Sequence, residues 1–129
     1  LIKRDSVVYA GDEKLHLYVQ VNPTTYKVFK SSYNDDGVEV DNVYYDNIVN
    51  VNIYRGASKI FGRDFRKEDF DGQVPHEFLK QAILSDIVLK KVDTDGLHYR
   101  VVLAMPDSSV SYQVEIIISL EGKMTIKKS

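Results

Sequence analysis

Two short segments of the chain carry carboxylates that could bind a hard cation. The first, Asp93-Thr94-Asp95-Gly96, begins like a calcium-binding loop. Such a loop also needs an oxygen ligand at its fifth position and a glutamate at its twelfth. Those positions hold Leu97 and Ala104, so the loop pattern fails and the segment instead predicts a hairpin turn between two strands.

The second acidic segment surrounds a predicted strand at 38–45. It contains the aspartates Asp35, Asp36, Asp41 and Asp46. Carboxylates at this density suit a hard cation, but charged side chains also protect a strand edge from pairing with other chains. We expect solvated loop acids here, and we predict no metal site in the chain.

The histidines have no spacing that is typical of a catalytic or metal site. His16 and His98 are expected on the outward faces of two strands, and no pair of histidines has the helical i, i+4 spacing of a zinc site. His76 lies beside Glu77 at an expected helix start, where it could transfer protons.

The chain has no cysteine, no nucleophile elbow and no glycine-rich phosphate loop. We therefore predict no catalytic residue and no cofactor. The alternative is a hydrolase or isomerase that uses His76 and surface carboxylates.

Tyrosine and amide side chains form the other candidate site. Along the segments 15–22 and 47–55, apolar residues alternate with polar ones, and the outward set is Tyr18, Gln20, Asn50, Asn52 and Tyr54. A flat sheet face of this composition can stack on a sugar or hydrogen-bond a peptide. Tyrosine is also common in strands simply because it packs well across them. We predict that these residues bind a ligand, which is a protein or a glycan.

Period-two alternation predicts the strands that must position these residues. It is clearest in the segments 15–22, 47–55, 97–104 and 110–119, each apolar on one side and polar on the other. Weaker strand patterns fill the gaps at 6–10, 26–33, 38–45, 60–65, 87–92 and 124–127. Turns rich in Gly, Asp and Asn separate the strands, so we expect antiparallel hairpins and meanders.

A single helix interrupts this pattern near residues 75–84. Phe78, Leu79, Ala82 and Ile83 form one apolar stripe at helical spacing, and Pro75 suits the first helical position. A helix this short must dock on a sheet to be stable. The sequence thus predicts a mainly β protein, either an antiparallel β-sandwich or a curled meander sheet, with this one embedded helix over an open edge or end.

Length and composition set broader limits on the fold and on its partners. At 129 residues we expect one domain. The net charge of −2 gives no bulk attraction to nucleic acid, and no apolar run reaches the roughly 20 residues of a membrane-spanning helix. The chain begins at Leu1 rather than Met, so we expect a removed leader, with residues 1–6 as the end of a tether. Nothing in the sequence indicates an oligomeric state.

Two segments resemble a known family. They are Ile-Tyr-Arg-Gly-Ala-Ser-Lys-Ile-Phe-Gly-Arg-Asp-Phe-Arg-Lys-Glu-Asp-Phe at 53–70 and Val-Pro-His-Glu-Phe-Leu-Lys-Gln-Ala-Ile-Leu at 74–84. They are similar to small bacterial lipoprotein-type domains of unknown function. The resemblance implies a β-rich domain at the cell envelope, lipid-anchored or periplasmic, that contacts the membrane only through an anchor on its precursor. It supplies no catalytic residue.

These observations together favour a non-catalytic cell-envelope module that binds a ligand or has a structural role. A small β domain that lacks a nucleophile, a metal cluster and a phosphate loop is more often of this kind than an enzyme. A weaker alternative is an accessory protein that donates a sheet edge to its partner.

Overall fold

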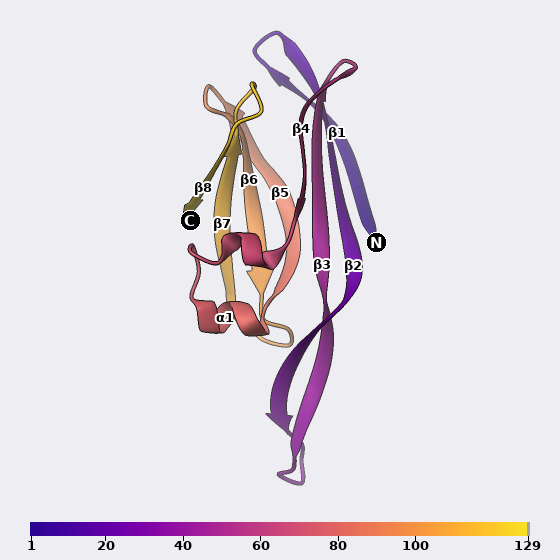
Figure 1. The fold of residues 1–129 in the computed structure, drawn as a ribbon, viewed down its shortest axis with the longest axis vertical. Coiled ribbons are helices and arrows are strands. Elements are labelled where there is room, and N and C mark those ends of the chain that lie inside the picture. Colours follow the sequence, from indigo (N-terminus) through magenta and orange to yellow (C-terminus); the bar gives the residue numbers. More distant parts are fainter. Residues whose placement is uncertain (129) are drawn as a thin grey trace.

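The computed structural model describes residues 1–128, which fold into two antiparallel four-stranded sheets that face each other (Figure 1). Sheet A has the order β1 (Ile2–Ala10), β2 (Glu13–Tyr33), β3 (Glu39–Arg55), β4 (Ser58–Phe65). Sheet B has the order β5 (Ile83–Asp93), β6 (Gly96–Ala104), β7 (Ser111–Ile118), β8 (Met124–Lys128). The predicted mainly β, antiparallel class is confirmed, and each sheet is a meander because its neighbours in space are also neighbours in sequence.

The core lies between the two sheets and is built from the apolar halves of the alternating strands. The inward stripes of β2 and β3 are buried, and so are those of β6 and β7. The largest fully buried side chains include Tyr99, Phe65 and Phe70. Because side chains alternate across a strand, burying one stripe leaves the polar residues between them on the outer faces. The polar side chains of the strands are therefore the ones that lie on the outer faces of the two sheets.

Strands β2 and β3 are much longer than their neighbours. The segments that the sequence divides into separate strands on either side of residue 23 are continuous in β2, with an irregular register between Pro23 and Lys27. Beyond that point the two strands continue as a hairpin arm, residues 27–45, which extends past the rest of the molecule (Figure 1). Lys30 Nζ donates to the carbonyl oxygen of Pro106 at 2.7 Å and Tyr44 hydrogen-bonds Asp107, so the β6–β7 loop anchors the arm.

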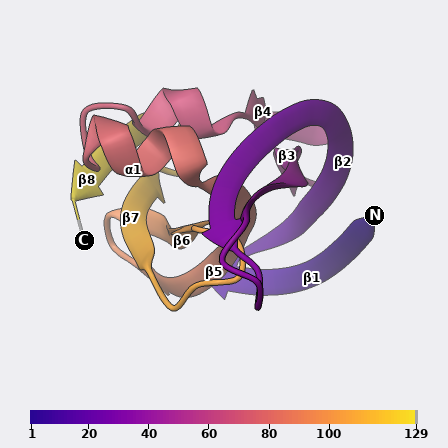
Figure 2. The ribbon, with the colours of Figure 1, turned by 90° about the horizontal axis from the view of Figure 1, so that it is seen from below.

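Two short helical segments connect sheet A to sheet B. They are the 3-10 helix η1 (Lys67–Phe70) and α1 (His76–Gln81), and they lie on the side of the molecule opposite β1 and β5 (Figure 2). Phe78 and Leu79, which belong to the predicted apolar stripe, are buried against the core, and so is Phe70 of η1. Docking of this kind explains how a six-residue helix is stable.

The helix predicted near residues 75–84 is present but shorter than its apolar stripe indicates. Pro75 is the extended N-cap rather than the first helical residue, and Ala82 is already extended. Ile83 and Leu84 then begin β5. The backbone of Leu84 is hydrogen-bonded by side chains of β3, a long-range interaction that a local helical pattern cannot reveal.

The start of the chain also differs from the expectation. Residues 2–6, expected to be a tether, form the first half of β1, with Ile2 opposite Val21 and Ser6 opposite Leu17. Arg4 makes a bidentate ion pair with Asp86 of β5, at 2.9 and 2.6 Å. Charged residues are common in edge strands because they discourage pairing with other chains, and they conceal the alternation that would identify the strand.

Candidate functional site

The structure brings all the predicted ligand-binding residues together on the outer face of sheet A. In the register of β2 and β3, Tyr18 lies opposite Asn52, and Gln20 lies opposite Asn50. Tyr54 pairs with His16. Directly opposite residues of an antiparallel pair point to the same side of the sheet, so the set forms one continuous surface that faces away from the core.

The amide side chains of this face hold one another in place. Asn50 Nδ2 donates to a carboxylate oxygen of Asp64 at 2.8 Å, and Asn52 Nδ2 donates to Asn50 Oδ1. On the neighbouring strand, Gln20 Nε2 donates to Asn22 Oδ1 at 2.8 Å. A chain of such bonds limits the side-chain rotamers, which lowers the entropic cost of binding a ligand.

A depression of about 610 Å³ lies at the end of this face that is next to the β3–β4 turn. It is lined by His16, Tyr18, Asn52, Tyr54 and the turn residues 56–57. The rings of Tyr18 and Tyr54 meet edge to face, with centroids 5.8 Å apart. Tyr18 is 42% exposed, so a ligand in the depression would contact a ring that is accessible but held by its neighbour.

Asn52 lines the depression and carries an unusual polar atom, which lies on the side of the residue next to β4. Its Oδ1 is buried and has no hydrogen-bond partner among residues 1–128. Gly62 lies opposite Asn52 on β4, and a Cβ at Gly62 would stand 2.7 Å from that oxygen and 2.2 Å from Lys59 Cε. The lysine side chain thus folds across the glycine and covers the oxygen, which would become accessible if the lysine moved.

Sequence reasoning did not identify His16, Lys59, Gly62 or the turn at 56–57 as parts of this site. The alternation of β2 extends to His16 and could have indicated it. The covering of Gly62 by Lys59 depends on the irregular register between Ile53 and Tyr54, which has no signature in the sequence.

The residues of the alternative enzymatic prediction are only partly brought together. A second depression of about 370 Å³, between the base of the hairpin arm and the two helices, is lined by His76, Asp71, Lys67 and Asp46 among others. His76 Nδ1 lies 3.3 Å from the Asp71 carboxylate, and these side chains are 62% and 51% exposed. Glu77 instead pairs with Lys80 at 3.3 Å. The aspartates Asp35, Asp36 and Asp41 lie in the exposed arm, away from His76.

Asp46, which also lines the second depression, hydrogen-bonds the backbone and so stabilises the fold. Its Oδ1 accepts hydrogen bonds from the backbone N–H groups of Asn47 and Leu84, each at 2.8 Å. It is nearly fully buried. An oxygen already bound by two donors is poorly placed to accept a proton from a substrate.

His98 is buried, although the sequence places it on an exposed outward face. Only 4% of the residue is exposed, its Nδ1 is 2.8 Å from Glu115 Oε1, and its Nε2 is 2.8 Å from Asp93 Oδ1. Hydrogen bonds to Glu115 and Asp93 raise the pKa of His98, and the same bonds lower the pKa of each carboxyl group. His98 therefore bridges two carboxylates, an arrangement that favours its protonated form.

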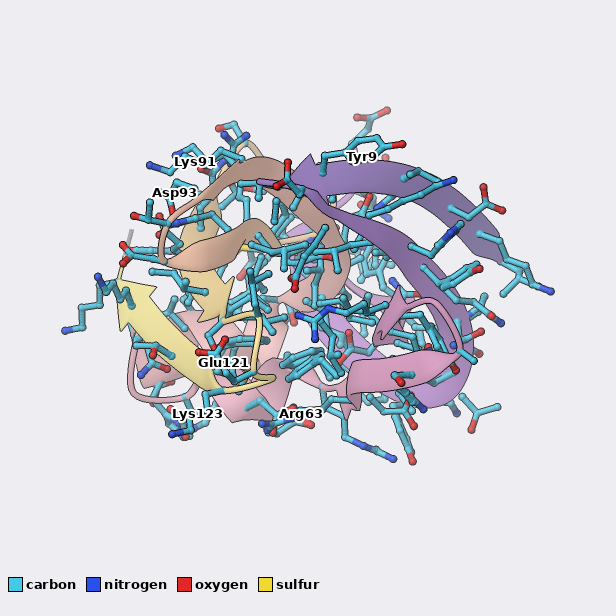
Figure 3. All side chains as sticks on the ribbon, turned by 90° about the horizontal axis from the view of Figure 1, so that it is seen from above. Tyr9, Arg63, Lys91, Asp93, Glu121 and Lys123 are labelled. Carbon is cyan, nitrogen blue, oxygen red and sulfur yellow. The ribbon has the colours of Figure 1, made fainter. Side chains whose placement is uncertain are left out.

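The same region holds a group of residue types that can bind metal ions. Ligand atoms of Asp93, Asp95 and His98 all lie within 4.8 Å of one another. Both ring nitrogens of His98 already face carboxylates, and the backbone N–H of Asp95 donates to Asp93 Oδ1 at 2.9 Å. Lys91 lies beside Asp93 at 3.5 Å (Figure 3). These contacts account for the cluster as an ion-paired hairpin turn, which is the structure predicted for Asp93–Gly96.

Comparison with known proteins identifies the family of the chain. No helix within residues 1–128 is long and apolar enough to cross a membrane. No curated protein matches the chain. The family model described as "Domain of unknown function (DUF4738)" matches residues 1–126, nearly the whole sequence. The chain therefore belongs to the DUF4738 family.

Proposed function

We propose that this protein is a non-catalytic binding module of the bacterial cell envelope, and that the outer face of sheet A receives a protein or glycan ligand. The observation that carries the proposal is the depression beside Tyr18 and Tyr54, which combines an aromatic pair with Asn52, whose buried amide oxygen has no partner within residues 1–128. Ligand sites commonly combine flat apolar surface with a few fixed polar groups.

The chemistry of the depression selects ligands that present hydrogen-bond donors. A buried acceptor without a partner costs about 1–3 kcal/mol. Once the Lys59 side chain moves aside, a donor supplied by the ligand recovers part of that cost at Asn52. Sugar hydroxyls and peptide N–H groups both supply such donors. The two tyrosine rings would contact the apolar face of a sugar or a peptide side chain.

The experiment begins with a search for the ligand on an immobilised glycan array and, in parallel, with envelope proteins of the native host. The double variant Tyr18→Ala/Tyr54→Ala is then compared with the wild type for binding to each verified ligand. We expect affinity to fall at least about tenfold, because two aromatic contacts are lost. The free energy of unfolding should change by about 1 kcal/mol or less, as is usual for surface positions.

A matched control separates this face from exposed aromatic surface in general. Tyr33→Ala/Tyr45→Ala removes two exposed tyrosines from the hairpin arm and should leave binding unchanged. If the Tyr18/Tyr54 variant retained wild-type affinity, or if the control variant lost as much, the outer face of sheet A would not be the binding site.

The envelope location is supported by the resemblance of the segments at 53–70 and 74–84 to lipoprotein-type domains. Metabolic labelling of the full-length precursor with a palmitate analogue tests the anchored form, and cell fractionation tests the periplasmic one. Recovery of the unlabelled protein with the cytoplasmic fraction alone would refute both.

The alternative, a hydrolase or isomerase, is supported by the His76–Asp71 contact within the second depression. It predicts that the protein turns over a member of a panel of chromogenic esters, phosphates and glycosides, that His76→Gln abolishes this turnover, and that Tyr18→Ala/Tyr54→Ala does not. Turnover that survives His76→Gln would exclude the histidine, and no turnover by the wild type would count against the alternative.

A further inference from the structure

A third opening lies between β1 and β5, the two edge strands that run side by side where the sheets meet (Figure 2). It encloses about 470 Å³, within the range of small-molecule sites. Charged and polar residues of β1 form part of its lining, and the apolar part comes from both sheets: Leu17, Val19, Leu89 and Tyr99. The apolar part of the opening therefore lies against the core.

Tyr99 carries a polar atom that no other residue of the described range 1–128 satisfies. The residue is fully buried, and its hydroxyl has no hydrogen-bond partner within residues 1–128. Buried tyrosine hydroxyls normally find a partner. Burial also raises the pKa of Tyr99, so the hydroxyl stays protonated at neutral pH and can donate a hydrogen bond.

The charges around the opening cancel one another. Arg4 is paired with Asp86 across the gap and also donates to the carbonyl oxygen of Ile87 at 3.1 Å. The remaining charged residues of the lining, Lys3 and Asp5, have opposite signs. An ionic ligand would therefore lose its hydration without meeting an unpaired charge, which is unfavourable.

We propose that this pocket binds a small uncharged molecule, whose apolar body lies against Leu17, Val19 and Leu89 and whose carbonyl or ether oxygen accepts a hydrogen bond from the Tyr99 hydroxyl. The ligand enters between β1 and β5. This pocket opens at the junction of the sheets, so it is separate from the depression on the outer face of sheet A, and the two sites can be tested independently.

The probes for this pocket are 2-octanone and octane, which differ by a carbonyl oxygen. Binding of each to the whole protein is followed by chemical-shift titration of the backbone amides. We expect saturable shifts in β1, β5 and β6 with both probes. Tyr99→Phe should weaken the ketone about two- to tenfold, the range of a net hydrogen bond, and should leave octane unchanged. Tyr112→Phe, on β7, is the matched control and should alter neither.

Two further variants complete the test. Tyr99→Phe removes an unpartnered hydroxyl, so it should fold with unchanged or higher thermal stability, which is measured first. Ser6→Trp places a bulky ring at the exposed mouth of the pocket and should block both probes, whereas Tyr18→Ala/Tyr54→Ala should block neither.

Three outcomes would overturn the proposal. The first is the absence of saturable binding by either probe. The second is equal weakening of ketone and alkane by Tyr99→Phe, which would show that the hydroxyl does not contact the ligand. The third is a crystal structure, grown with the ketone, in which only an ordered water accepts the Tyr99 hydrogen bond.

Discussion

The imidazole of His98 lies between carboxylates from two strands, Glu115 on β7 and Asp93 at the end of β5. Lys91 Nζ lies 3.5 Å from Asp93, and its charge opposes part of the rise in the pKa of His98. Lys90 and Lys127 lie near Glu115 and lower its pKa further. This network is almost buried at its centre, so its charge state affects the stability of the fold.

The pH dependence of unfolding tests this network. Because the pKa of His98 is raised above its ordinary value of 6.5, its contribution is complete below pH 6.5 and is lost as pH rises through the folded-state pKa. The lowered pKa values of Asp93 and Glu115 have the opposite effect, a loss of stability as pH falls below about 4. We expect the stability difference between wild type and His98→Gln to be largest near pH 5.5 and to shrink towards pH 9, as measured by urea denaturation.

The exposed ring of His76 provides the control for this experiment. His76→Gln should change the unfolding profile much less, because more than half of that side chain is in water. A difference between wild type and His98→Gln that grew with rising pH would contradict the ion-paired assignment.

Residue-level prediction from the sequence succeeded where alternation alone decides the answer. Tyr18, Gln20, Asn50, Asn52 and Tyr54 share a face because strand periodicity places them there. How deeply a side chain is buried, and which side chains surround it, depends on the neighbouring strands. The sequence therefore could not show that Glu115 and Asp93 enclose His98, or that the hydroxyl of Tyr99 lacks a partner.

At the scale of elements, strand β5 is joined to sheet A by side chains rather than by a continuous ladder. Asp46 Oδ1 accepts from the backbone N–H of Leu84, and Asn47 Nδ2 donates to the carbonyl oxygen of Leu84 at 2.9 Å. The two side chains satisfy the backbone groups of Leu84 that face away from β6. They also protect an edge that could otherwise pair with another chain.

Replacing Asp46 tests the importance of this junction. Asp46→Ala leaves the buried N–H of Leu84 without an acceptor and should lower the free energy of unfolding by about 2–3 kcal/mol. Asp46→Asn keeps an oxygen at the same place and should cost about 1 kcal/mol. Equal effects of the two substitutions in chemical denaturation would show that the acceptor is not what stabilises the junction.

The hairpin arm, in contrast, is expected to contribute little to the free energy of unfolding. Residues 31–41 are exposed throughout, whereas Val28 at the base belongs to the buried set. Replacing 31–41 by Asn-Gly should give a tight turn between Lys30 and Asn42 and change the free energy of unfolding by less than about 1 kcal/mol. Calorimetry measures the change, and a loss of several kcal/mol would show that the arm supports the fold. Ligand binding should persist, since the arm lies outside the proposed site.

Element boundaries were predictable only where local signals agree with the tertiary structure. The turn at Asp93–Gly96 has its own chemistry and was predicted correctly. The end of α1 and the start of β1 depend on partners more than 15 residues away, such as Asp46 for Leu84 and Val21 for Ile2. A short helical stripe and a charged edge strand carry no signal of those partners.

At the scale of the whole molecule, two sheets share one core and are joined differently on their two sides. The two helical segments cover one side (Figure 2). On the other side, the Arg4–Asp86 bridge joins β1 to β5 beside the Tyr99 pocket. This arrangement leaves the outer face of sheet A as a broad surface with tyrosines, amides and a depression. We propose that ligands are recognised on that surface.

Mapping a verified ligand onto the protein by backbone amide chemical shifts tests this central claim most directly. The account predicts that the largest shifts fall on residues 16–20, 50–57 and 59–62 of sheet A, with little change in the hairpin arm or in sheet B. Shifts concentrated around His76 and Asp71, or along the arm at 27–45, with none at Tyr18 and Tyr54, would contradict it.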